Sequence, residues 1–182
     1  MLLMPPHERT DDPSSGPGFS HLDAAGGAHM VDVSGKAVTR RVAEASCRVL
    51  LAAATGERHA ELPKGDAWVV ARLAGIQGAK RTGELIPLAH PLPLDQVEVE
   101  LRALPAAGER GGVEVRSRVV TTGRTGAEME ALTACATAAL ALYDMVKAVD
   151  RGAAITDLRL EAKSGGRSGD WRRGEGGTEP AG

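Results

Sequence analysis

Four segments of the chain alternate apolar and polar residues with the period of two that is typical of a β-strand with one buried face. These segments are residues 41–50, 96–104, 112–121 and 155–163. The glycine-rich stretch PAAGERG separates the second segment from the third and predicts a hairpin between them. The alternation therefore predicts a sheet of four strands.

Two longer segments between these strands have the length and composition of helices. The first begins at Asp66, a residue type that commonly caps helix N-termini, and ends before Pro87. The second is rich in alanine, opens on the capping-box sequence TGAE from Thr125 and runs to about Val149. Residues 51–62 are only weakly helical. The pattern predicts two main helices.

The resulting order, β-α-β-β-α-β, is that of ferredoxin-like α+β domains, in which two helices pack on one face of an antiparallel sheet. Residues 1–19 and 172–182 are rich in proline, glycine and charge, so we expect disordered ends on either side of one domain that spans residues 20–171. Many unrelated functions share this fold, so the fold alone names none of them.

Composition excludes several classes of function. Only 2% of the residues are aromatic, which disfavours nucleic-acid binding by base stacking, and a formal charge of -2 gives no general attraction for nucleic acid or an anionic membrane. Cys47 and Cys135 lie far apart without metal-ligand spacing, so we expect neither a metal site nor a disulfide. We find no signal peptide and no membrane-spanning run, and therefore expect a soluble, cytoplasmic protein.

A narrow line of polar residues follows the second helix. At about 100° per residue, these side chains project within roughly 60° of one direction: Glu130, Thr133, Thr137, Asp144, Lys147 and Arg151. One interpretation is an exposed helix edge with a weak Asp144–Lys147 surface pair. The narrowness of the line among alanines and leucines favours a groove or interface along a packed helix.

The length of this helix limits what one copy of the chain can bind. Glu130 and Asp144 are fourteen residues apart, which is roughly 21 Å along the helix axis. A small substrate would not touch both. We therefore expect either an elongated ligand or a second subunit that brings the start of its helix to the end of this one, and we favour the second.

Several other segments contain groups suited to an anionic ligand. His90 lies in a stiff proline-rich segment and has either a structural role or a site role. The turn TTGRTG ends a strand and opens a helix, so its backbone N–H groups and Arg124 suit an anion. Each group alone has an ordinary structural explanation, but a polyphosphate ligand would account for all of them together: Lys64, His90, Arg124, Lys147 and Lys163.

Four segments together resemble the cyclic pyranopterin monophosphate synthase family, whose members catalyse the second step of molybdenum cofactor biosynthesis. They are AHMVDVSGKAVTRR, KGDAWVVARLAGIQGAKRTGELIPLAHPLPL, TTGRTGAEMEALTACATAALALYDMVKAVDRG and RLEAKSGGRSG. The resemblance implies conversion of (8S)-3',8-cyclo-7,8-dihydroguanosine 5'-triphosphate to cyclic pyranopterin monophosphate with release of diphosphate. It also implies a homohexamer, a trimer of dimers with active sites between subunits, and no redox cofactor.

The resemblance also implies roles for individual residues. Asp144 and Lys147 of YDMVK match the catalytic acid/base pair, and Lys64 of KGD matches another essential lysine. The other matched positions are those at which the family holds the substrate and its phosphates: Leu88, Ala89, His90, Met129, Glu130 and Arg41. Such a reaction needs proton transfer beside a cationic phosphate site.

One departure from the family pattern leaves an alternative open. Position 89 is alanine where the family usually has cysteine, so no thiol at that place is essential if the protein is active. Ala89 favours a catalytically inactive nucleotide-binding or assembly homologue on the same scaffold. The residues that favour an enzyme are intact: Lys64, His90, Asp144 and Lys147. A generic ferredoxin-like binding domain is a third interpretation.

Overall fold

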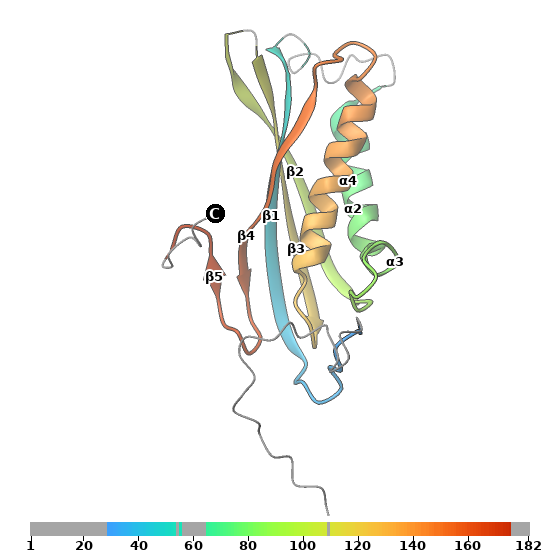
Figure 1. The fold of residues 1–182 in the computed structure, drawn as a ribbon, viewed down its shortest axis with the longest axis vertical. Coiled ribbons are helices and arrows are strands. Elements are labelled where there is room, and N and C mark those ends of the chain that lie inside the picture. Colours follow the sequence, from blue (N-terminus) through green and yellow to red (C-terminus); the bar gives the residue numbers. More distant parts are fainter. Residues whose placement is uncertain (1–28, 54, 56–64, 109, 176–182) are drawn as a thin grey trace, which may run out of the picture. The chain divides into compact units, whose positions relative to one another are not determined.

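The computed structural model describes residues 29–53, 55, 65–108 and 110–175. The predicted disordered segment 1–19, most of the weakly helical stretch 51–62, and Lys64 lie outside the described residues. The elements in chain order are β1 (Thr39–Ala52), α2 (Ala67–Lys80), α3 (Thr82–Leu85), β2 (Leu94–Ala107), β3 (Arg110–Gly123), α4 (Glu128–Val146), β4 (Ala154–Ser164) and β5 (Trp171–Arg172), as Figure 1 shows.

The strands form one sheet in the order β2-β3-β1-β4-β5, and each pair of neighbours is antiparallel. The hairpin of β2 and β3 and the placement of β3 between β2 and β1 are those of a split β-α-β arrangement. The α+β, ferredoxin-like prediction is thus confirmed. The short strand β5 was not predicted, and it includes Arg172, the first residue of the segment expected to be a disordered tail.

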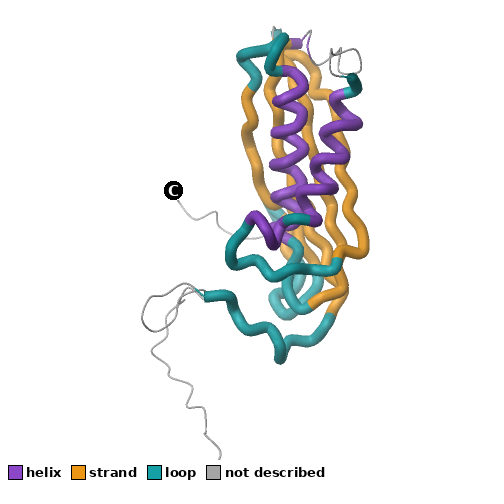
Figure 2. Tube along the Cα trace, turned by 90° about the vertical axis from the view of Figure 1, so that its right-hand side faces the viewer, coloured by secondary structure: helices purple, strands orange, loops and turns teal. Residues whose placement is uncertain are grey.

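Helices α2 and α4 lie side by side on one face of the sheet (Figure 2). Because the chain has few aromatic residues, small and branched aliphatic side chains fill the space between the layers. The inward residues of β1 and β3 are fully buried, as are residues of α4 that face them: Cys47, Val49, Val113, Val115, Leu142 and Val146. The opposite face of the sheet bears charged pairs such as Glu44–Arg118 and Glu114–Arg116.

The middle of the polar line on α4 packs against α2. A Cβ on Gly75 would lie 2.9 Å from the carbonyl oxygen of Ala134, and a Cβ on Gly78 would overlap Thr137, so the two helices approach at glycines. The Thr137 hydroxyl donates to the carbonyl of Thr133 at 2.7 Å, which satisfies it within its own helix. The middle of the line is therefore an interface between α4 and α2, which is the second of the two possibilities that the sequence left open, and it is not a groove open to a ligand.

The start of α2 agrees with the sequence and its end does not. Asp66 is the N-cap, and its Oδ1 accepts hydrogen bonds from the amides of Trp68 at 2.9 Å and Val69 at 3.3 Å. The helix ends at Lys80 and the one-turn α3 follows. The buried Thr82 hydroxyl donates to the carbonyl of Ala79 at 3.0 Å. This bond satisfies one of the carbonyls left open at the end of α2, at a point where the predicted helix would have continued.

The capping box predicted for α4 is absent. The helix begins at Glu128, with Ala127 as N-cap and no side-chain cap hydrogen bond. The Glu128 carboxylate instead pairs with Lys163 of β4, with 3.2 Å between Nζ and Oε1. The helix also ends at Val146, three residues before the predicted Val149.

Helix α4 corrects one further expectation. Its 19 residues are long and apolar enough, by length and composition alone, to cross a membrane. However, 56% of that apolar window is buried within the fold. The core helix of a globular domain has the same character, so this helix is weak evidence for a membrane.

Candidate active site

A cavity of about 660 Å³ lies at the end of the molecule where α4 begins. Its wall contains four cationic side chains and one carboxylate: Lys36, Arg41, Arg124, Arg167 and Glu128. The first amides of α4 have no side-chain cap, and a helix N-terminus favours negative charge. The chemistry of this wall suits a phosphate or polyphosphate ligand.

Two arginines connect the segments that form the cavity. The Arg41 Nε donates to the carbonyl of Gly123 at 3.2 Å, and its Nη2 donates to the carbonyl of Arg124 at 3.1 Å. The Arg124 Nε in turn donates to the carbonyl of Lys36 at 3.2 Å. The loop before β1 and the turn between β3 and α4 are thus held to each other.

Glu130, on the first turn of α4, is a buried carboxylic acid. The residue is 3% exposed, and among the described residues its Oε2 has no hydrogen-bond partner. Burial raises the pKa of Glu130 to about 7, with a smaller contribution from the nearby charge of Glu128. At neutral pH this carboxyl is therefore populated in both its protonated and its ionised form.

Glu130 should make the protein less stable as the pH rises. Its pKa in the folded state is above the value of an unfolded chain, so the folded state holds a proton that the unfolded state releases between about pH 4.5 and pH 7. We expect Glu130→Gln to be as stable as wild type near pH 4.5 and more stable at pH 8, by up to about 3 kcal/mol. Urea unfolding at the two pH values measures this difference.

The matched control for Glu130 is Glu84→Gln, which neutralises an exposed carboxylate on α3. It should leave the pH dependence of unfolding as in wild type. A parallel loss of stability in the Glu130→Gln and wild-type proteins between pH 4.5 and pH 8 would contradict a buried, protonated Glu130.

His90 lies at the same end of the molecule as the cavity. Its segment passes the end of β3: the Thr121 hydroxyl donates to the carbonyl of Pro93 at 2.6 Å, and a Cβ on Gly123 would lie 3.6 Å from Leu92. The pKa of the Asp32 carboxyl is lowered by two hydrogen bonds from Ser34, and the nearby His90 lowers it slightly further. The imidazole is half-buried.

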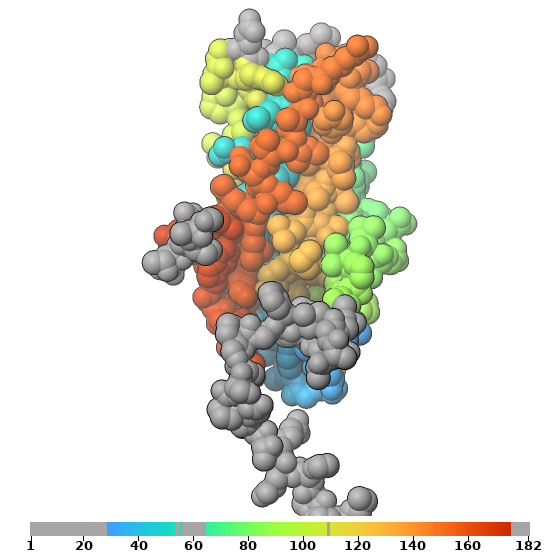
Figure 3. All heavy atoms as spheres, viewed as in Figure 1, coloured from blue at the N-terminus to red at the C-terminus, as the bar shows by residue number. Residues whose placement is uncertain are grey.

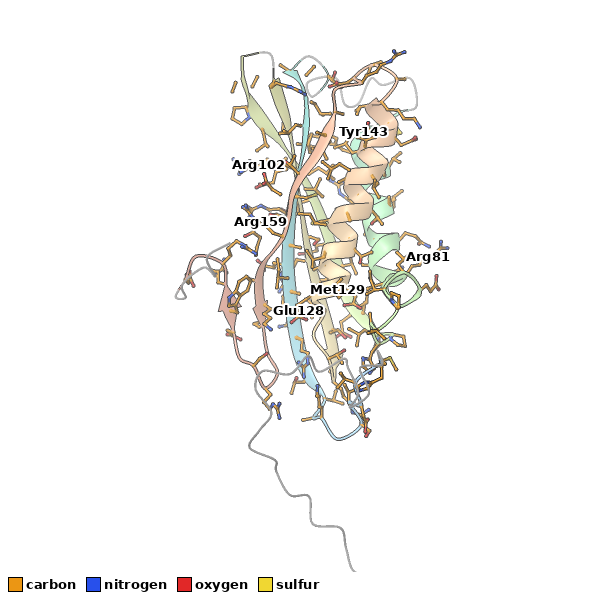
Figure 4. All side chains as sticks on the ribbon, viewed as in Figure 1. Arg81, Arg102, Glu128, Met129, Tyr143 and Arg159 are labelled. Atoms are coloured by element: carbon orange, nitrogen blue, oxygen red, sulfur yellow. The ribbon has the colours of Figure 1, made fainter. Side chains whose placement is uncertain are left out.

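The other expected substrate-binding residues are distributed around this end. Leu88 and Ala89 are half-buried in the segment between α3 and β2. Met129 is 38% exposed beside Glu128 at the start of α4, as Figure 4 shows. Lys64, the other expected catalytic residue, lies outside the described residues.

Asp144 and Lys147 lie at the opposite end of α4, where they follow Tyr143 in the sequence; Figure 4 labels Tyr143 at that end of the helix. Lys147 Nζ is 2.5 Å from Asp144 Oδ1, and the two side chains are 55% and 53% exposed. The hydrogen bond and charge of Asp144 raise the pKa of Lys147. In one isolated chain this lysine is therefore charged at neutral pH, and a second surface must desolvate it before it can act as a base.

Asp150 is a residue that the sequence patterns missed. It is 7% exposed, and its carboxylate accepts from the amides of Ala52 at 2.6 Å and Gly152 at 3.0 Å. These bonds tie the exit of α4 to the end of β1 and so position the turn that contains Lys147. The Asp-x-Gly turn DRG is the signal that could have identified it.

The described residues of the predicted site therefore fall into two groups within one chain. The residues at the start of α4 and around the cavity lie together, whereas Asp144 and Lys147 are separated from them by the length of a 19-residue helix, roughly 27 Å. In the space-filling view, α4 and β4 run side by side between the two ends (Figure 3). Arg151, expected on the polar line, lies beyond the helix in the following turn.

The two cysteines are free thiols in the core. Cys47 donates a weak hydrogen bond to the carbonyl of Cys135 at 3.6 Å, and the Cys135 thiol contacts the Ser117 hydroxyl at 3.3 Å. Within the part of the chain that the structure describes, no three His, Cys, Asp or Glu side chains converge as metal ligands.

The fold is that of a ferredoxin-like α+β protein, and the cationic wall of its cavity has the chemistry to suit a phosphorylated ligand. The family model described as "MoaC family" matches residues 30–166. The chain therefore belongs to the MoaC family.

Curated relatives resemble the chain over most of its length. A protein of Streptomyces avermitilis named "Cyclic pyranopterin monophosphate synthase" is 52% identical over 94% of this chain and 99% of its own length. A protein of Streptomyces coelicolor with the same name is 55% identical over 90% and 98%, respectively. "Cyclic pyranopterin monophosphate synthase 3" of Mycobacterium tuberculosis is 52% identical over 90% and 91%.

Proposed function

We propose that this chain is a lyase of molybdenum cofactor biosynthesis. It converts (8S)-3',8-cyclo-7,8-dihydroguanosine 5'-triphosphate to cyclic pyranopterin monophosphate and releases diphosphate. The names of the relatives and membership of the MoaC family support this activity. The relatives bear the names of synthases, which gives no support to the inactive alternative.

The single structural observation that supports the proposal most directly is the cationic cavity at the start of α4. A substrate with a triphosphate needs positive charge to bind and, as diphosphate leaves, further positive charge to stabilise the leaving group. Lys36, Arg124 and Arg167 supply that charge, with Arg41 beside them. Leu88, Ala89, His90, Met129 and Glu130 hold the substrate at the same end.

Proton transfer is assigned to the other end of α4. Asp144 and Lys147 form an acid/base pair that opens the purine-derived ring and assists closure of the cyclic phosphate, and Lys64 is a further catalytic lysine. The 2.5 Å contact between the Asp144 and Lys147 side chains supports direct proton exchange within the pair. No cofactor is assigned to the reaction.

The separation of the two ends supports an active site shared between subunits of a homo-oligomer, which we propose to be a hexamer built as a trimer of dimers. The helices expose large apolar side chains that a partner subunit could cover: Val69, Val70, Leu73 and Leu140, which are 40–62% exposed. In such an assembly, Lys147 of one subunit would be desolvated beside the cavity of another. We place this oligomer in the cytoplasm.

The direct test is incubation of the purified protein with the cyclised nucleotide and measurement of released diphosphate. Release at many equivalents per subunit is the expected result. A protein that binds the nucleotide with no diphosphate release would instead be the inactive homologue.

A further inference from the structure

We propose that Arg41 is a positioning residue that holds the β3–α4 turn by its main chain, and that it is not a direct ligand of the phosphates. This inference rests on the proposed function and refines one residue of that site. We use the name Arg41 clamp for the guanidinium of Arg41, the main-chain carbonyls of Gly123 and Arg124 that accept its hydrogen bonds, and Gly166, which covers it.

The first observation is which groups accept hydrogen bonds from the Arg41 guanidinium. Arg41 lies opposite Thr121 in the pairing of β1 with β3, so its side chain reaches just past the end of β3. There its Nε and Nη2 donate to two successive carbonyls, those of Gly123 and Arg124, at 3.2 and 3.1 Å. The planar fork of an arginine suits this paired arrangement.

The second observation is what covers the guanidinium. Gly166 has a φ of +80°, and a Cβ at this position would overlap Nη1 and Cζ of Arg41. The backbone of the β4–β5 loop therefore lies against the guanidinium. By contrast, Lys36 and Arg167 also line the cavity, and no side-chain ion pair or hydrogen bond engages their charged groups among the described residues. These two are better placed than Arg41 to meet phosphate oxygens.

The third observation is what the clamp positions. The two acceptor carbonyls belong to the turn that leads into α4, on whose first turn Met129 and Glu130 lie. A displacement of about 1 Å in a positioning element can cost a reaction about 100-fold in rate. The clamp thus sets the position of the start of α4 relative to the substrate. Loss of the clamp should therefore lower kcat more than it raises KM.

The main test compares variants of Arg41 that differ in charge and shape. Arg41→Lys keeps the positive charge, but a single ammonium group cannot reproduce the fork at two carbonyls. We expect kcat to fall by about 10-fold or more in Arg41→Lys, to within about threefold of Arg41→Ala, while KM changes by less than about threefold. Lys36→Ala, which removes a charge that binds the phosphates, should by contrast raise KM by more than about threefold.

A glycine pair gives a matched control. The methyl group added in Gly166→Ala would displace the Arg41 guanidinium without altering any charge. This variant should therefore lower kcat as Arg41→Lys does. Gly169→Ala introduces the same kind of backbone strain, at φ +68°, with no atom within 4 Å of the new methyl group, and should retain wild-type kcat. If Gly166→Ala does not fold, the comparison of Arg41→Lys with Arg41→Ala decides the question.

Amide hydrogen exchange tests the clamp without substrate. Amides from Arg124 to Glu130 should exchange faster in Arg41→Lys than in wild type, and at the wild-type rate in Gly169→Ala. Unchanged exchange in Arg41→Lys would reject the clamp even if the wild-type protein turned over no substrate. Near wild-type kcat in Arg41→Lys, together with a raised KM in Arg41→Ala, would also reject it, because Arg41 would then act by its charge.

Discussion

Lys147→Ala is expected to lower the rate of diphosphate release by about 10²- to 10⁴-fold, the usual contribution of a general acid or base. Among the described residues the ammonium group forms an ion pair with the neighbouring Asp144, and its side chain is more than half exposed. An exposed pair of this kind contributes little to folding. The variant should therefore unfold at nearly the wild-type temperature and keep the wild-type oligomeric state while losing turnover.

Asp144→Asn should have a similar effect, because it removes the carboxylate that shares a proton with Lys147. Lys80→Ala, which removes an exposed lysine from the last turn of α2, is the matched control and should retain full activity. The role assigned to the pair is wrong if either Lys147→Ala or Asp144→Asn turns over substrate at close to the wild-type rate. Size-exclusion chromatography and thermal melting establish that the variants are otherwise intact.

The sequence predicted the four long strands well because each has stretches in which apolar and polar residues alternate, with one buried face. Residues such as Val113 and Val115 face the helices while Glu114 and Arg116 face away, and this period of two is visible without any tertiary information. The boundaries of the helices were less predictable. Whether Glu128 caps α4 or pairs with Lys163 depends on β4, which lies 35 residues further along the chain.

The polar line on α4 shows why the candidate site was only partly predictable. Helical periodicity correctly placed Glu130, Thr137 and Asp144 on one side of the helix, but it could not show that α2 covers the middle of that side. That contact depends on Gly75 and Gly78. Because glycine has no side chain, these two positions add nothing to the pattern of apolar and polar residues from which the helix was predicted. Likewise, nothing in the sequence pattern linked Arg41 to the carbonyls of a turn more than 80 residues away.

Mixing two inactive variants should restore activity if the site is shared between subunits. His90→Ala damages the cavity end and Lys147→Ala damages the far end of α4, and the two ends are separated by the full length of that helix. In an oligomer assembled at random from equal amounts of both chains, about a quarter of the sites would combine an intact cavity with an intact Lys147 from a neighbour. Diphosphate release should recover to about that fraction of the wild-type rate.

The control mixture combines Lys147→Ala with Asp144→Asn. Because Asp144 and Lys147 belong to the same end of the same chain and contact each other directly, every copy of that end is damaged and no activity should return. Co-expression with two affinity tags, followed by purification through both, ensures that each oligomer contains both chains. If neither mixture is active, although the oligomers contain both chains, the whole site lies within one subunit. If the control mixture is active, Asp144 and Lys147 act in different sites.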